Sequence, residues 1–253
     1  MNAMHDKGKT SWGKEAAWYS EHLANEDTYH AKVILPNLLR LIDPKAGQKV
    51  LEIGCGEGFF AEEIAKKGST VTGCDISPEL IALAKKKGKA NYLVTPAQNL
   101  SMFENNSFDV VLAVLTLQNM ERLDVVMKEV SRVLVPRGRF VFVLNHPMIR
   151  IPQASSWDYD EEKKVQYRRL DAYLSERRTA IDMHPGKGKK SLTYSFHRSL
   201  QEYMKLLRGG GFTITRLEEW ISHKTSQPGP RAKAEDVSRK EFPLFMMIEA
   251  TRG

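Results

Sequence analysis

The stretch V-L-E-I-G-C-G-E-G, residues 50–58, decides the fold. An apolar run stops there at three glycines on alternate positions, Gly54, Gly56 and Gly58. The run has the composition of a buried strand, and residues 58–67 carry apolar side chains at helical spacing. Glycine is needed where a chain turns tightly or where another group approaches the backbone closely. The stretch therefore predicts a strand, a glycine loop and a helix whose first amides face a bound anion or polar group.

The composition fits one domain of ordinary size. The chain has 253 residues, of which 42% are hydrophobic. No apolar run approaches the roughly 18 residues that a membrane span needs, and the first residues lack the apolar stretch of a signal peptide. The two cysteines, Cys55 and Cys74, are too few for a disulfide framework or a thiolate zinc site. We expect a cytoplasmic protein without a metal.

Strand and helix patterns alternate along the first half of the chain. Strands are expected at 49–53, 70–75, 91–94, 108–115 and 139–144, and helices at 58–67, 78–87 and 125–135. Such alternation predicts a parallel sheet that is covered by helices on both faces. A capping box, S-L-Q-E, opens another helix at Ser199. Two apolar runs, 212–217 and 243–250, are expected to form a final antiparallel pair joined by a polar loop.

The spacing of the glycines limits the possible ligands. Counted from Gly54, a dinucleotide fingerprint needs a third glycine at position 59, and Phe59 stands there. The chain also lacks the phosphate loop G-x-x-x-x-G-K-[ST]. An acid, Asp75, ends the second expected strand about 20 residues after the loop, which is the spacing of a ribose acceptor. Ser77 is already placed as the N-cap of the next helix, so Asp75 is free to accept hydrogen bonds from hydroxyl groups.

The segment V-L-E-I-G-C-G-E-G-F-F-A resembles the first motif of class I S-adenosylmethionine-dependent methyltransferases. The resemblance covers roughly residues 48–145 as motifs in order, and it is nearest to the small-molecule, type 11 or UbiE-like superfamily and to an uncharacterised bacterial group within it. It implies an α/β fold with a Rossmann-like, doubly wound, mostly parallel seven-stranded sheet and an antiparallel last strand. It also implies S-adenosyl-L-methionine as cofactor.

The same resemblance suggests a division of a single domain into four parts. These are an N-terminal helical cap at 1–45, a cofactor-binding core at 46–145, an inserted substrate lid at 146–198, and the end of the core sheet at 199–253. The lid segment is rich in charged and aromatic residues, and it has no clean period.

The resemblance also implies which residues contact the cofactor, namely those at the glycine loop and at the ends of strands two, three and four. The expected contacts are Glu52, Gly54, Cys55, Gly56, Gly58, Asp75, Ile76, Ala97, Gln98, Thr116 and Leu117. Tyr19 and Tyr29 are candidates for a roof over the cofactor, although tyrosines on a helical stripe more commonly pack in a core. The chain departs from the family at Pro96, which stands where an acid usually meets the adenine amino group.

Candidate catalytic residues follow strand five or precede the last crossover helix, where substrate-facing side chains are expected. They are His146, His197 and Tyr194. Each could take a proton from the methyl acceptor. A histidine at such a place can equally be bonded to a loop carbonyl.

The distribution of basic residues suggests which kind of molecule accepts the methyl group. The net charge is +7, and most of the excess lies in residues 147–198 and 222–241. Arginine suits bidentate pairing with carboxylate or phosphate. We therefore expect a small polar or anionic substrate. The candidate substrate-binding residues in the lid are Arg150, Trp157, Arg168 and Arg198.

Two other functions fit parts of the sequence. Basic residues with interleaved aromatics could track single-stranded RNA, which would make the protein an RNA-directed methyltransferase or an RNA-binding module. Acids interrupt this basic segment throughout, and the N-P-P-Y signature of nucleobase enzymes is missing after strand four. A catalytically dead regulator is disfavoured by the intact glycines and Asp75. We expect a monomer or a homodimer without nucleic-acid or membrane partners.

Overall fold

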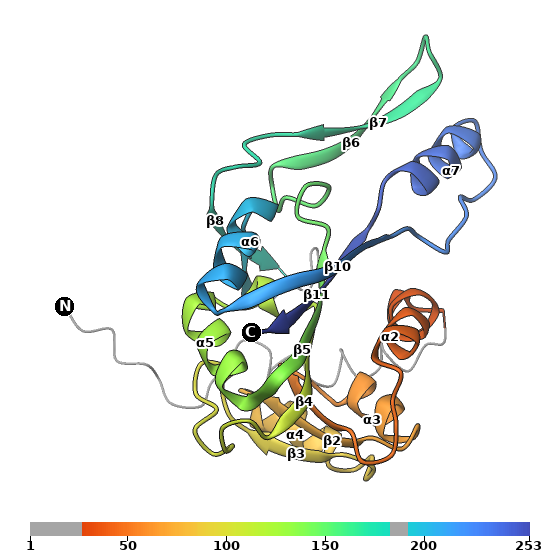
Figure 1. The fold of residues 1–253 in the computed structure, drawn as a ribbon. Helices are drawn as coiled ribbons and strands as arrows, with labels where there is room; N and C mark the ends of the chain where they lie inside the picture. The colour runs from red at the N-terminus through yellow and green to blue at the C-terminus, as the bar shows by residue number, and fades with distance from the viewer. Residues whose placement is uncertain (1–26, 183–191) are drawn as a thin grey trace.

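The computed structural model describes residues 27–182 and 192–253, which form one large sheet with helices on both of its faces and two small two-stranded sheets (Figure 1). The sheet has seven strands in the order β10-β11-β5-β4-β1-β2-β3. Their bounds are β1 (Lys49–Ile53), β2 (Thr70–Asp75), β3 (Asn91–Val94), β4 (Phe108–Val114), β5 (Leu134–Asn145), β10 (Phe212–Trp220) and β11 (Phe245–Arg252). Strands β1 to β5 pair in parallel, whereas β11 is antiparallel to both β5 and β10. The predicted fold class is confirmed.

Alternate residues of the central strands enter two separate apolar cores. Leu51 and Phe142 pack in one core with α5 (Leu123–Val133) and α6 (Leu200–Gly209). Val50 and Val143, their neighbours in sequence, pack in the other core. That second core contains α2 (Leu35–Ile42), α3 (Phe59–Ala65) and α4 (Pro78–Ala84). Burial on both faces explains why these strands are continuous apolar runs. Among the described residues, no helix is both long and apolar enough to cross a membrane.

The helix caps match the sequence at one place and differ at another. Ser77 caps α4, where its hydroxyl accepts a hydrogen bond from the Leu80 amide at 3.2 Å. Ser199 stands at the N-cap of α6 but its side chain makes no capping hydrogen bond, so the predicted capping box is wrong. The amide that the capping box would bind, that of Glu202, donates to the Ser199 backbone carbonyl at 3.1 Å. The Leu200 amide donates to the Tyr173 hydroxyl at 2.9 Å, so the chain before α6 supplies one acceptor for the start of the helix.

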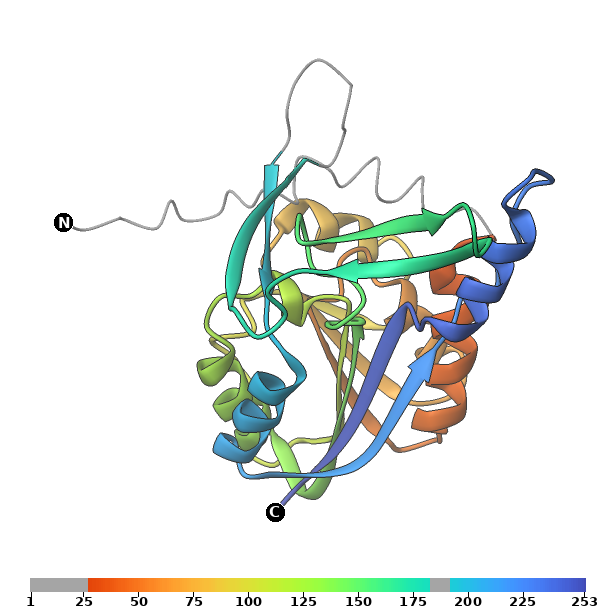
Figure 2. The same cartoon turned by 90° about the horizontal axis from the view of Figure 1, so that it is seen from above.

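The segment after β5 forms two antiparallel hairpins that the sequence did not reveal. They are β6 (Ser155–Asp160) with β7 (Val165–Leu170), and β8 (Arg177–Asp182) with β9 (Leu192–His197). The expected polar loop before β11 also contains a helix, α7 (Ala232–Glu241), which has Ser238 as its one buried residue. Ser238 donates to the Gln166 carbonyl at 3.0 Å, and Figure 2 shows the β6–β7 hairpin extending across to α7.

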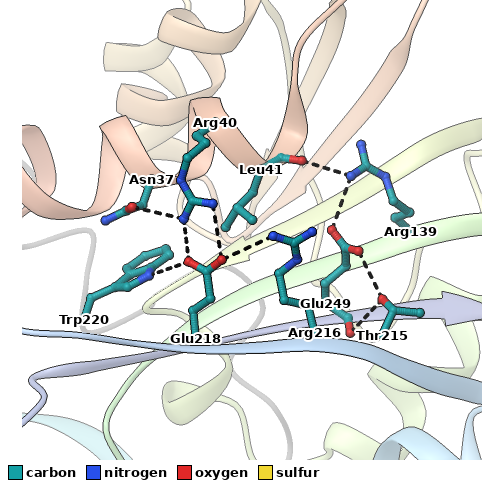
Figure 3. A network of polar contacts seen from close by, with 9 residues as sticks. All are labelled: Asn37, Arg40, Leu41, Arg139, Thr215, Arg216, Glu218, Trp220 and Glu249. Atoms are coloured by element: carbon teal, nitrogen blue, oxygen red, sulfur yellow. Dashed lines mark hydrogen bonds and ion pairs between the residues drawn. The ribbon is translucent and has the colours of Figure 1, made fainter.

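A network of polar contacts fixes α2 against the sheet (Figure 3). Arg139 of β5 donates to the carbonyls of Leu41 and Ile42, at 3.0 and 2.8 Å, and so satisfies the C-terminal end of α2. Its other partner is Glu249 of β11 at 3.3 Å. These bonds join the helix to two strands of the sheet.

A second ion pair in Figure 3 reaches the edge of the sheet. Arg40 of α2 pairs with Glu218 of β10 at 2.5 Å, and the Trp220 indole donates to the same carboxylate at 3.0 Å. The Arg40 guanidinium beside it lowers the pKa of Glu218. The π-helix His30–Ile34 continues directly into α2. Fixing α2 therefore also fixes Tyr29 and His30, which lie beside the functional site described below.

Candidate functional site

The three glycines of the loop after β1 all have left-handed backbone angles, with φ of +64° at Gly54, +56° at Gly56 and +79° at Gly58. A Cβ at Gly54 would lie 2.1 Å from Oγ1 of Thr116, and one at Gly58 would lie 2.3 Å from the Tyr92 hydroxyl. At these two positions it is therefore the protein's own Thr116 and Tyr92 that leave no room for a side chain. Gly56 remains, and it lines a cavity.

Asp75, at the end of β2, holds the loop in place. Its Oδ2 accepts a hydrogen bond from the Gly56 amide at 3.0 Å, and its Oδ1 accepts from the Ser77 amide at 2.9 Å. Burial raises the pKa of Asp75, and the two amides partly offset that rise. Each carboxylate oxygen has a further lone pair, so the group can accept additional hydrogen bonds from a ligand.

Glu52 of β1 is buried close to Asp75. Burial raises the pKa of Glu52 to about 8, and the negative charge of Asp75 adds to the rise. Its Oε2 atom has no hydrogen-bond partner within the described residues. Glu52 is therefore mostly protonated at neutral pH, which avoids a second buried negative charge beside Asp75.

The two cysteines are inert at this site. Cys55 and Cys74 are both buried and unpaired with each other. Burial raises the pKa of the Cys55 thiol well above its usual value, and it raises that of Cys74 to about 12. Neither is a thiolate near neutral pH, so neither provides a nucleophile.

A first cavity, of about 470 Å³, opens above the glycine loop. It brings together many of the predicted cofactor contacts: Gly54, Gly56, Asp75, Ile76, Ala97, Gln98 and Thr116. The predicted residues Glu52, Cys55, Gly58 and Leu117 are not part of its lining. Leu117 packs in the core, and the other three support the loop from below or within.

A second cavity, of about 410 Å³, adjoins the first. Its lining comes from the segment before α2, from the ends of β4, β5 and β11, from the chain between β5 and β6, from the β8–β9 hairpin and from α6. The lining residues are Tyr29, His30, Leu115, Gln118, Asn119, Asn145, Pro147, Arg150, Pro152, Ile181, Thr193, Ser195, Phe196, His197, Arg198, Tyr203 and Phe245. Leu115, Asn119 and Phe196 line both cavities. The two cavities therefore meet at these three residues.

Strand β9 forms the wall between the cavities. Successive side chains of a strand point to opposite sides, and β9 follows this rule here. Tyr194 lines the first cavity, whereas Thr193, Ser195 and His197 line the second. Tyr194 is 43% exposed, and the Arg178 guanidinium lies 3.9 Å from the centre of its ring.

His197 is buried and has a defined tautomer. Its Nε2 lies 2.7 Å from the carbonyl oxygen of Tyr173. A carbonyl oxygen can only accept, so Nε2 carries the proton and, in the neutral ring, Nδ1 carries the lone pair. His197 thus combines a fixed ring with a basic nitrogen in the wall of the second cavity.

Other predicted residues lie elsewhere. His146 lines neither cavity, because its Nε2 faces Glu219 of β10 at 2.7 Å. Arg168 donates to the Ile149 carbonyl at 2.8 Å and lies 5.2 Å from the Trp157 ring centre, so this pair holds the β6–β7 hairpin outside both cavities. Tyr29 lines the second cavity rather than the first. Tyr19 falls outside the described residues.

Two arginines of the prediction do line the second cavity. Arg198 is 7% exposed, and its Nη2 donates to the Glu121 carbonyl at 2.6 Å. Arg150 is exposed, and it donates to Oδ1 of Asn145 at 3.2 Å; partial desolvation by its surroundings lowers its pKa. Sequence reasoning missed all three residues at the junction, Leu115, Asn119 and Phe196. The one available signal was alternation along β9, which requires Phe196 to share a side with Tyr194.

Comparisons with known proteins agree with this arrangement. Residues 51–142 match the sequence model of a family described as "Methyltransferase domain". A demethylmenaquinone methyltransferase of Tropheryma whipplei is 33% identical over 111 residues, which are 43% of this chain and 46% of that protein. A ubiquinone biosynthesis O-methyltransferase of Xanthomonas oryzae is 32% identical over 106 residues, 40% of this chain and 44% of that one. The chain thus spans about half the length of the curated relatives it matches.

A solved structure covers more of the chain. An S-adenosylmethionine-dependent methyltransferase from Mesorhizobium loti is 24% identical and superposes with a TM-score of 0.72. The match covers 90% of this chain and 99% of that one. It shows that the fold extends beyond residues 51–142 to the strands and helices of the C-terminal part.

We predict that Gly54→Ala destabilises the protein more than Gly47→Ala does. Both glycines have positive φ, but a Cβ at Gly47 meets nothing within 4 Å. Gly47→Ala should cost about 1 kcal/mol of unfolding free energy from backbone strain alone. Gly54→Ala should cost roughly 1–3 kcal/mol more, because Thr116 must move. Urea denaturation measures both, and equal losses would contradict the close contact.

We predict that Glu52→Gln changes how stability depends on pH. The pKa of Glu52 is raised in the folded protein, so its contribution is fully present below about pH 4.5 and is lost as pH rises towards 8. The stability of the wild type relative to Glu52→Gln should therefore fall by up to about 1.4 kcal/mol per pH unit in that window. Denaturation at several pH values tests this. Glu104→Gln, at an exposed position, is the control and should show no such slope.

Proposed function

We propose that this chain, whose residues 51–142 belong to the class I S-adenosylmethionine-dependent methyltransferases, transfers a methyl group to a small polar or anionic molecule. The observation that carries the proposal is the pair of adjoining cavities. The first is built on the family's glycine loop and Asp75, and the second meets it at Leu115, Asn119 and Phe196. A methyl donor in one cavity and a methyl acceptor in the other can meet at the shared boundary, away from bulk water.

The residues of the first cavity fit S-adenosylmethionine. Asp75 has spare acceptor capacity for two neighbouring ribose hydroxyls, and its position is fixed by two backbone amides. Ala97 and Gln98 lie in the lining where the adenine edge would be met, and Gln98 replaces the family's acid as a polar partner. When bound, the cofactor supplies a methyl group activated by a positively charged sulfur.

The two cavities differ in the charge of their lining residues, and this difference supports a donor in the first cavity and an acceptor in the second. Asp75 and Glu121 line the first cavity, which suits a positively charged donor. Arg150 and Arg198 line the second, and its described lining contains no aspartate or glutamate. The second cavity is thus suited to a neutral or anionic acceptor.

His197 is the best-placed proton acceptor. It lines the second cavity, and the bond to Tyr173 leaves Nδ1 as the basic nitrogen. Nδ1 can take a proton from a hydroxyl or amino group of the acceptor as that group becomes nucleophilic. Tyr194, on the other side of β9, would cover the first cavity rather than act as a base.

We predict that Asp75→Asn raises the Kd for S-adenosylhomocysteine by about 10- to 100-fold. The amide keeps one acceptor oxygen and cannot serve both backbone amides and two hydroxyl groups, and hydrogen bonds to a charged partner contribute about 1.5–3 kcal/mol. Isothermal calorimetry measures the affinity, and circular dichroism checks that the variant is folded. An unchanged Kd would remove Asp75 from the site, and no binding by the wild type would refute the proposed function.

We predict that His197→Gln slows methyl transfer by roughly 10²- to 10⁴-fold with little change in S-adenosylhomocysteine affinity. Transfer is followed with a labelled methyl group in a metabolite extract and then with the acceptor identified from it. His146→Gln is the matched control and should retain turnover; the reverse pattern would exclude His197 as the base.

A further inference from the structure

Arg198 is a buried cation that has no counter-ion among the residues the structure describes. The residue is 7% exposed, and its hydrogen-bond partners in the described structure are neutral groups, the backbone carbonyl of Glu121 and the Tyr203 hydroxyl. Nη1 is enclosed and has no partner within the described residues. The described structure shows no carboxylate in ion-pair contact with this guanidinium. Removing a cation from water without pairing it costs several kcal/mol, and buried charges in proteins are normally paired.

Arg198 lines the second cavity, and so does a second arginine from a different segment. Arg150, in the chain after β5, bonds to the neutral side chain of Asn145 and has no ion pair in the described structure. Two guanidinium groups therefore contribute positive potential to one cavity whose described wall carries no acid. A negatively charged ligand is the simplest partner for this arrangement.

The rest of the wall limits what else the ligand can carry. Apolar and aromatic side chains from five segments make up much of it, namely those of Tyr29, Leu115, Ile181, Phe196 and Phe245. A cavity of about 410 Å³ lies at the small end of the range for ligand sites. An inorganic oxyanion would leave these surfaces exposed to water, whereas a small organic acid would cover them.

We propose that the second cavity binds a small carboxylic acid with an apolar or aromatic body, whose carboxylate is neutralised by Arg198 and Arg150. This inference rests on the proposed function, because it names the class of acceptor that the second cavity takes. Binding the carboxylate at Arg198 brings the rest of the acceptor next to His197, the preceding residue in the wall. Arg198 thus acts as a specificity residue for the acid, and His197 as the group that handles its proton.

The test is a calorimetric titration of the full chain saturated with S-adenosylhomocysteine. The probes are benzoate and hexanoate, with benzamide as the neutral counterpart of benzoate and inorganic phosphate as the small oxyanion. We expect benzoate or hexanoate to bind at least 10-fold more tightly than benzamide and phosphate. Raising the salt concentration should weaken the binding of the carboxylates.

Substitutions identify the residue responsible. Arg198→Met should remove the preference for benzoate over benzamide, Arg198→Lys should retain part of it, and Arg150→Met should reduce it. Arg169→Met is the matched control, since Arg169 is exposed on β7 and pairs with Asp171. Thermal denaturation should show that Arg198→Met remains folded, because it removes an unpaired buried charge. The affinity for S-adenosylhomocysteine should stay within about twofold in every variant.

The outcomes separate this inference from the proposed function. Equal affinities for benzoate and benzamide, no binding of either carboxylate, or an unchanged preference in Arg198→Met would overturn the acid-binding site while leaving the cofactor site intact. Phosphate binding without carboxylate binding would overturn it in favour of a phosphorylated or inorganic ligand. Failure of the wild type to bind S-adenosylhomocysteine would instead overturn the proposed function.

Discussion

The hydrogen bond from the Gly56 amide to Asp75 is the contact on which the rest of the site depends. It joins the loop after β1 to the end of β2, and the Ser77 amide holds the other carboxylate oxygen at the start of α4. Thr116, after the end of β4, leaves no room for a Cβ at Gly54, and Tyr92 of β3 leaves none at Gly58. Groups from four neighbouring strands thus fix the conformation of this loop, so the Asp75 carboxylate keeps its position without a ligand. Glu52 stays protonated beneath it and adds no competing charge.

The core of the fold could be predicted because its strands are buried on both faces. For β1, β2 and β3 the structure has the same bounds as the sequence prediction. β1 is a buried run that ends at Gly54, whereas β2 and β3 are short runs of strand-forming residues that stop before Ser77–Pro78 and Thr95–Pro96. The β6–β7 and β8–β9 hairpins lack that signal. Most residues of β6 and β7 are partly or fully exposed, so their pairing depends on cross-strand contacts and not on a buried face. Helix α7 has no apolar stripe, because it buries only Ser238.

The two cavities likewise differ in how far the sequence predicts them. The first is made at strand ends, where motif spacing alone indicates which residues gather, and the family assignment for residues 51–142 is confirmed. The second depends on where β8 and β9 fold back, which the sequence does not determine. The sequence favoured His146 over His197 because His146 directly follows strand five. The backbone direction after β5 turns His146 towards Glu219, whereas alternation along β9 turns His197 into the cavity.

The junction of the cavities contains a backbone conformation that packing alone does not favour. Leu115 has φ of +53°, in the left-handed region, where a bulky residue costs of order 1–3 kcal/mol. A glycine would remove this strain, but it would also remove the side chain that closes both cavities at the point where they meet. The amide of Leu115 donates to the Val143 carbonyl at 2.8 Å, and its own carbonyl accepts from Asn119 at 3.3 Å. Hydrogen bonds to both of its backbone groups therefore hold Leu115 in this strained conformation. Its side chain in turn shapes the boundary between the proposed donor and acceptor cavities.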